Sequence, residues 1–255
     1  MGVDGMAQDE LLYDVTYRHI RNDIMHLTLE PGAGLSVRKL AEMYKVSRTP
    51  AQEAVIRLQK EDLVRAYPQS RTIVSKISIS RVQAEQFIRK TLEIASVDDF
   101  IVHSSPLVTD ALEYIISQQQ KLTHTQNHTE FFESDNKFHN LIFETADKGL
   151  AWSIVNLASS HYYRFRFLSI KIRGLNERIV DEHKQILRAA KRGDAAAMKQ
   201  AIADHVDYIQ REYEELTAMY PQYFASKWGG ACGCGEPPAR PNGRIAHAPF
   251  PSVLP

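Results

Sequence analysis

Four side chains in the C-terminal half of the chain have the types and spacing of a metal-binding set. Asp135 and His139 are four residues apart, so on a helix they project from one face. His183 and His205 each lie on the apolar stripe of a further helix, and we therefore expect all four to point into one core. Buried polar groups need partners, and three imidazoles with one carboxylate could share a divalent ion. Three nitrogens and one oxygen suit zinc or nickel.

The same residues allow two other interpretations. Each histidine could be hydrogen-bonded singly within the core, which is the ordinary state of a buried imidazole. Alternatively, an ion with an open coordination position could generate hydroxide, which would indicate a metal-dependent hydrolase. A hydrolase needs an additional base, and no Glu of this sequence falls in a motif such as His-Glu-x-x-His.

A second group of side chains, near the N-terminus, has the chemistry of nucleic-acid recognition. Arg48 can donate a bidentate pair of hydrogen bonds to guanine or hold a phosphate, and Gln52, one turn later, can pair with adenine. Arg38, Lys39 and Arg71 would flank them as phosphate or minor-groove contacts. The alternative is that these are ordinary solvated charges on a small helical domain.

The elements that must position this second group follow from apolar periodicity and turn residues. Residues 11–28 carry the stripe of an amphipathic helix. Ser36 is expected to cap a short helix to about Tyr44, and Ser47 a second helix with Pro50 in its first turn. In that second helix, four apolar residues should face the core: Ala51, Ala54, Val55 and Leu58. Residues 63–67 and 72–74 predict the two strands of a hairpin. This order is typical of a winged helix-turn-helix, whose second helix enters the major groove of DNA.

The rest of the chain has a helical pattern from Ser80 to about Tyr220. Breaks near residues 105–106, 124–128, 148–149, 173–174 and 192–194 predict about six helices. We therefore expect a mainly α protein, with a winged helix-turn-helix domain at 10–76 and an all-α bundle at 80–224. Residues 226–255 are rich in Gly and Pro and predict a disordered tail.

Composition excludes several classes of protein. The 255 residues are 44% hydrophobic and 24% charged, values typical of globular domains. No apolar run of about 18 residues could cross a bilayer and no signal peptide is evident, so we expect a cytoplasmic protein with no membrane contact. Cys232 and Cys234 lie in the tail and cannot form a disulfide scaffold. The net charge is zero, but residues 11–76 hold eleven Lys and Arg against seven Asp and Glu.

The N-terminal pattern resembles the GntR family of bacterial transcription regulators over residues 12–76. The matching residues are Leu29-Glu30-Pro31-Gly32, Leu35-Ser36, Leu40-Ala41, Val46-Ser47-Arg48-Thr49-Pro50, Glu53-Ala54, Leu58 and Leu63-Val64. With this resemblance, we expect a DNA-contacting set of Arg38, Lys39, Ser47, Arg48, Thr49, Gln52 and Arg71. Gln52 departs from the family's common Arg, which suggests an altered base preference. Arg71 replaces a usual Gly, so a positive φ there would be strained.

Residues 80–224 resemble the FCD effector domain of the FadR subgroup of that family. Its metal-binding branch carries an Asp-x-x-x-His pair, then a His, then another about twenty residues on. Asp135, His139, His183 and His205 match in type, order and spacing. The resemblance implies a metal completed by water or by the carboxylate of an organic-acid effector. It also matches Arg89 to an effector-site arginine, and we expect Arg164, with Arg166 as a second candidate, to clamp the carboxylate.

These expectations combine into a regulator rather than an enzyme. We expect a homodimer that places two winged helices on a palindromic operator in double-stranded DNA. A small carboxylate metabolite bound at the metal would control operator affinity, and repression relieved by the ligand is the expected sign. The alternatives are a repressor that responds to the metal ion alone and, less favoured, the metal-dependent hydrolase.

Overall fold

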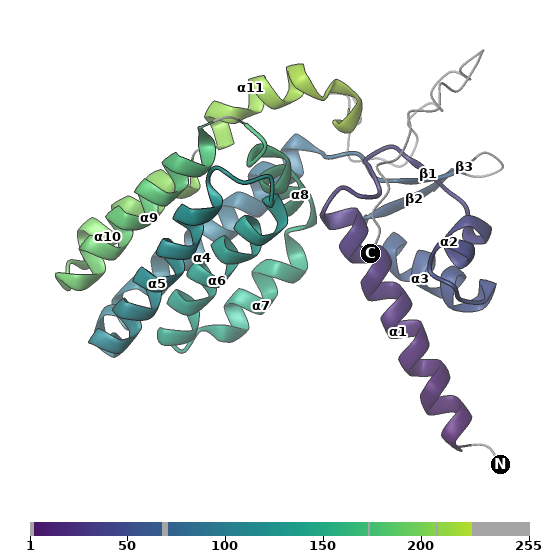
Figure 1. Ribbon diagram of the computed structural model, residues 1–255, viewed down its shortest axis with the longest axis horizontal. Coiled ribbons are helices and arrows are strands. Elements are labelled where there is room, and N and C mark those ends of the chain that lie inside the picture. Colours follow the sequence, from purple (N-terminus) through teal and green to yellow (C-terminus); the bar gives the residue numbers. More distant parts are fainter. Residues whose placement is uncertain (1–2, 68–70, 173, 208, 226–255) are drawn as a thin grey trace. The chain divides into compact units, whose positions relative to one another are not determined.

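The computed structural model describes residues 3–67, 71–172, 174–207 and 209–225. The fold class predicted from the sequence is confirmed, because the described chain is a winged helix followed by an all-α bundle (Figure 1). The predicted disordered tail, with both cysteines, and the hairpin tip at residues 68–70 lie outside the described residues.

The winged helix is built from three helices and three short strands. The order is α1 (Val3–Met25), β1 (Gly34–Leu35), α2 (Val37–Met43), α3 (Arg48–Lys60), β2 (Val64–Tyr67) and β3 (Arg71–Val74). The strands form an antiparallel sheet in the order β1-β3-β2, with Gly34 opposite Ile73 and Val64 opposite Val74. Strand β1 was not predicted, because two residues are too few to show an alternating pattern.

Helix α3 presents the two faces that its sequence predicts. Ala51, Ala54, Val55 and Leu58 are buried in the core of the winged helix, where Ile20 and Ile24 of α1 join them. The turn between α2 and α3 holds Lys45 at φ 55°, a left-handed conformation that redirects the chain.

Two local expectations for the winged helix need correction. Ser36 and Ser47 precede α2 and α3 as predicted, but neither side chain makes a capping hydrogen bond. Arg71 does not have a positive φ: it begins β3 in regular pairing with Tyr67, so the strain anticipated there does not arise.

The bundle contains more helices than the sequence suggested. Its elements are α4 (Ile79–His103), α5 (Pro106–Leu122), α6 (His128–Thr145), α7 (Gly149–Ala158), α8 (Ser160–Ser169), α9 (Leu175–Lys191), α10 (Ala195–Val206), α11 (Ile209–Met219) and the 3₁₀ turn η1 (Pro221–Tyr223). Two interruptions without Gly or Pro account for the difference from about six helices. Ser159 leaves the helical conformation between α7 and α8, and α10 ends before α11 at Asp207.

The core of the bundle is rich in aromatic side chains and also contains polar ones. Helices α4, α5, α6, α9 and α10 lie side by side (Figure 1) around Phe131, Phe138 and Ile186. Several charged and polar residues are buried among them: Arg89, Glu93, Gln119, Asp135, His139, His183 and His205. Such groups need partners, and their arrangement defines the first candidate site. No described helix is long and apolar enough to cross a bilayer.

Candidate functional site

The structure brings Asp135, His139, His183 and His205 together in the bundle core. Asp135 and His139 come from α6, His183 from α9 and His205 from α10. One ligand atom from each lies within 4.8 Å of the others, and all four side chains are buried. The Nε2 atoms of His139 and His205 are 3.1 Å apart, and His183 Nε2 is 3.4 Å from Asp135 Oδ1.

Several separations between ligand atoms in this cluster are close to those around a tetrahedral ion, and none exceeds 4.8 Å. Two ligand atoms, each about 2.0–2.1 Å from a tetrahedral zinc, are separated by roughly 3.3–3.4 Å. The separations within the cluster are 3.1, 3.4 and 3.9 Å for the pairs His139–His205, His183–Asp135 and His139–Asp135. His183 Nε2 is buried and has no hydrogen-bond partner among the described residues. A shared cation would satisfy this atom, which the single hydrogen bond of His183 to Gln119 leaves unpaired.

Each imidazole is fixed by an acceptor on its outer nitrogen. The Nδ1 of His139 contacts the Glu93 carboxylate, that of His205 lies 2.8 Å from Glu182 Oε2, and that of His183 lies 2.8 Å from Gln119 Oε1. A carboxylate or amide oxygen accepts the Nδ1 proton, so this arrangement leaves the Nε2 lone pairs directed at the cluster. Outer acceptors of this kind orient metal-binding histidines in proteins.

Electrostatics place Asp135, His139 and His183 in the protonation states that metal ligands need. Burial would raise the pKa of Asp135, but the nearby Arg166 guanidinium and the histidines hold it below its ordinary value. Burial lowers the pKa of His139 well below its ordinary value, with Arg89 adding to the effect. The pKa of His183 is likewise lowered by burial and by His205. Asp135 is therefore a carboxylate, and His139 and His183 are neutral imidazoles, as metal binding requires.

Two of the three candidate effector arginines lie beside this cluster and one does not. Arg166 donates a hydrogen bond to Asp135, and its Nη1 donates to Asn136 Oδ1 at 3.2 Å. Arg89 is buried and pairs with Glu93 at 3.4 Å. Arg164 is directed elsewhere: its Nη1 donates to the Ser75 carbonyl oxygen at 2.6 Å. Arg164, expected to clamp an effector, thus makes its hydrogen bonds away from the cluster, whereas the second candidate, Arg166, lies beside it.

Helix α8 contacts the winged helix as well as the cluster of Asp135 and the three histidines. Arg164 reaches Ser75, directly after β3, and the Tyr163 hydroxyl lies 3.2 Å from His26 Nε2. The Ser78 amide donates to His161 Nδ1 at 3.1 Å, which leaves the Nε2 proton of this histidine facing Asp62, 3.6 Å away. Sequence periodicity gave no sign of these contacts, because all of them join residues more than 80 positions apart.

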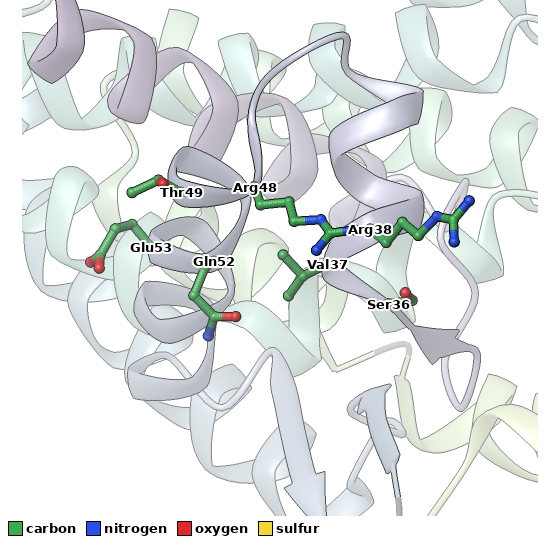
Figure 2. A pocket seen from close by; sticks show the side chains of 7 residues that line it. All are labelled: Ser36, Val37, Arg38, Arg48, Thr49, Gln52 and Glu53. Carbon is green, nitrogen blue, oxygen red and sulfur yellow. The ribbon is translucent and has the colours of Figure 1, made fainter.

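The second candidate site is a hollow on the exposed face of the helix-turn-helix. Its volume is about 530 Å³, and its lining comes from the start of α2 and the first turns of α3: Ser36, Val37, Arg38, Arg48, Thr49, Gln52 and Glu53. Figure 2 shows the Arg48 side chain reaching from α3 toward Arg38 of α2. Arg38 forms a solvent-exposed pair with Glu42 at 2.9 Å, while Arg48 has no ion pair among the described residues.

Four of the seven sequence-predicted DNA contacts line this hollow, and three lie outside it. Arg38, Arg48, Thr49 and Gln52 are brought together, whereas Lys39, Ser47 and Arg71 are exposed but not part of the lining. The lining also includes Val37 and Glu53, which sequence reasoning did not single out. Their positions in the sequence could have predicted this, because Val37 begins α2 beside Arg38 and Glu53 follows Gln52 on α3.

Comparison with protein families assigns both halves of the chain. Residues 12–74 match the family described as bacterial regulatory proteins, gntR family, and residues 86–208 match the FCD domain. Both matches describe transcription regulators rather than enzymes, so the hydrolase alternative is not supported.

Individual relatives agree with this assignment. A regulator from Streptomyces ambofaciens is 32% identical over 82% of this chain and 88% of its own length. The HTH-type transcriptional repressor RspR of Escherichia coli is 28% identical over 83% of this chain and 92% of its own. Among solved structures, E. coli McbR/YncC has the same fold, with a TM-score of 0.67 at 17% identity over 82% of this chain and 98% of that one.

Proposed function

Because the chain belongs to the GntR family of transcription regulators and carries an FCD domain, we propose that it is a repressor controlled by a small carboxylate bound at a metal site. The observation that carries this proposal is the buried set of three imidazoles and one carboxylate, each imidazole held by an outer acceptor and two guanidinium groups close by. A bacterial DNA-binding regulator acts where the chromosome lies, so we expect this protein in the cytoplasm.

The hollow on the helix-turn-helix is the proposed DNA-reading surface. Arg48 and Gln52 project from the exposed face of α3, the helix that enters the major groove in this class of domain. Arg48 would pair with guanine or a phosphate and Gln52 with adenine, while Glu53 adds an acceptor suited to cytosine. The remaining proposed contacts, mainly to the DNA backbone, are Arg38 and Thr49 in the lining and Lys39, Ser47 and Arg71 outside it.

An apolar surface on α4 and α7 supports the proposed homodimer. Phe87 of α4 and Leu150 and Leu157 of α7 are 69%, 76% and 67% exposed, and Ile154 continues the same face of α7. The two helices contact each other, so these side chains belong to neighbouring elements. A second copy of the chain would cover them and present two reading helices to a palindromic operator.

The surroundings of the metal cluster favour an anionic effector. The cationic groups within reach are Arg89 and Arg166, and both are buried. Zinc or nickel, when bound, would supply a further positive charge and an open position for a carboxylate oxygen. In the structure described, Arg166 pairs with the ligand Asp135. An ion that takes over the charge of Asp135 leaves Arg166 available to donate to an effector carboxylate.

Helix α8 supplies a route from this site to the DNA-reading half. Arg166 faces the cluster, while Tyr163 and Arg164, on the same ten-residue helix, hold α1 and the end of the wing. A change at Arg166 that shifts α8 therefore acts on the winged helix through existing hydrogen bonds. If α8 takes one position with the ligand and another without it, the protein has two conformations that bind the operator with different affinities. Such a difference is what coupling between the two sites requires.

The test compares the variant His183→Ala/His205→Ala with the wild type in metal content, organic-acid binding and operator affinity. We expect the double variant to lose the metal and the response to the acid while keeping operator binding. The matched control is His124→Ala, which removes an exposed histidine 3.3 Å from Glu177. Unchanged metal content and ligand response in the double variant would refute the proposal. Operator affinity that follows metal alone, with no acid effective, would instead support the metal-responsive repressor.

A further inference from the structure

A second hollow, apart from the metal cluster and the reading face, lies where α1 meets α6, α7 and α8. Its volume is about 350 Å³, which falls within the range of small-molecule sites. Its polar lining includes Arg21 of α1, Asn136, Lys137 and Asn140 of α6, and Asn156 of α7, and its apolar lining includes Trp152. Residues from both the winged helix and the bundle therefore form one pocket.

The pocket holds hydrogen-bonding groups that the protein does not use. Asn140 and Asn156 are half-buried, and within the described part of the chain their side-chain amides form no hydrogen bond with another residue and Lys137 has no carboxylate partner. Arg21 is held by Glu61 at 3.0 Å and so keeps a fixed place at the rim. Each amide offers both donors and an acceptor, which is the complement of a hydroxyl group.

The charges and the apolar wall of the pocket indicate which class of ligand it would bind. Arg21 and Lys137 contribute positive charge, and the one carboxylate in the lining, Glu133, is occupied by the Tyr163 hydroxyl at 3.1 Å and by His26 at 3.4 Å. The Trp152 ring gives an apolar wall for carbon atoms. We infer that this pocket binds a small hydroxyl-rich anion of the sugar-acid type, without the aid of a metal.

This site lies next to the metal cluster but does not depend on it. Arg166 donates to Asn136 in the pocket wall and to Asp135 in the cluster, so it joins the two sites. A ligand in the pocket would contact α1 and the bundle at the same time. It would therefore stabilise one placement of the winged helix by binding across the junction.

The experiment is calorimetric titration of chelator-treated protein with D-gluconate, D-galacturonate and D-glycerate, alongside the neutral polyol sorbitol. We expect saturable binding of at least one acid in the presence of chelator, weaker binding of sorbitol, and the same acid affinity in His183→Ala/His205→Ala. Asn140→Ala and Asn156→Ala should each weaken binding about tenfold, and Asn22→Ala, an exposed amide of α1, should not.

Three results would show that this pocket is not a metal-independent site for the acid. They are the absence of binding of all three acids, loss of binding on chelation or in the histidine double variant, and equal affinities for the asparagine variants and the wild type. The second result would place the acid at the metal cluster, which would support the function proposed above. Circular dichroism of each variant checks folding, and sorbitol binding as tight as the acids would overturn the anionic specificity.

Discussion

Replacing Glu182 by Gln tests whether the outer acceptors of the histidines organise a metal site. The Glu182 carboxylate accepts the Nδ1 proton of His205 at 2.8 Å and lies 3.7 Å from Arg178. It is partly exposed, so an amide of nearly the same size should leave the fold intact. The variant keeps an acceptor oxygen but removes the negative charge that makes the His205 imidazole a stronger ligand.

The expected magnitude follows from the number of acceptors that remain. Removing one outer partner of a metal ligand typically weakens metal affinity about 10- to 100-fold. Gln retains the hydrogen bond, and Glu93 and Gln119 still hold His139 and His183. We therefore expect the lower end, about tenfold, which corresponds to about 1.4 kcal/mol.

The assay is a competition titration of zinc between the protein and a chromophoric chelator. Glu177→Gln is the matched control, because this residue lies on the same helix, α9, and pairs only with the exposed His124 in the described structure. We expect its zinc affinity to equal that of the wild type. An unchanged affinity in Glu182→Gln, or an equal loss in both variants, would show that the carboxylate does not support a metal ligand.

Three further predictions concern DNA binding, assembly and the contact between α8 and the winged helix. Arg48→Ala should cost about 1–3 kcal/mol of operator binding in a gel-shift titration, and an unchanged affinity would remove Arg48 from the reading surface. Ile154→Glu, which charges the apolar face of α7, should shift the protein toward a monomer in analytical ultracentrifugation; an unaltered dimer would show that the interface lies elsewhere. His161 and Arg65 hold the pKa of Asp62 below its ordinary value of 3.8 against burial, so its ionised form stabilises the fold above that pH. Asp62→Asn should therefore lower the free energy of unfolding at pH 7 by no more than about 1 kcal/mol, since the side chain is partly exposed, and the deficit should shrink as pH falls below 3.8. A deficit that stays constant with pH would show that Asp62 does not act through its charge.

The sequence predicted those features that depend on local periodicity. The buried face of α3 could be assigned because four apolar residues recur at helical spacing: Ala51, Ala54, Val55 and Leu58. Asp135 and His139 could be paired for the same reason, since a spacing of four residues fixes a shared face. Strand β1 escaped prediction because its two residues acquire their structure only by pairing with β3.

Features that depend on the rotation of a helix within the bundle could not be predicted in the same way. Arg164 and Arg166 are two residues apart, which turns them by about 200° around a helix axis, so they face nearly opposite sides. Which one meets Asp135 depends on the break at Ser159, where α8 begins without Gly or Pro to mark it. The acceptors of the histidine Nδ1 protons could not be predicted for a related reason, because each lies on a different helix from its histidine: Glu93, Gln119 and Glu182.

The contacts of α8 also bear on how such regulators can be recombined. The family boundaries divide the chain near residues 74 and 86, which suggests that a DNA-reading half could be exchanged there for another. Yet two residues far beyond that boundary form hydrogen bonds with the DNA-reading half: Tyr163 with His26, and Arg164 with the Ser75 carbonyl oxygen. A chimera joined between the halves would keep both hydrophobic cores, but the residues that form these hydrogen bonds would come from two different proteins. We expect hybrid regulators to bind their operators and yet ignore their inducers unless residues 160–166 travel with the donor's winged helix.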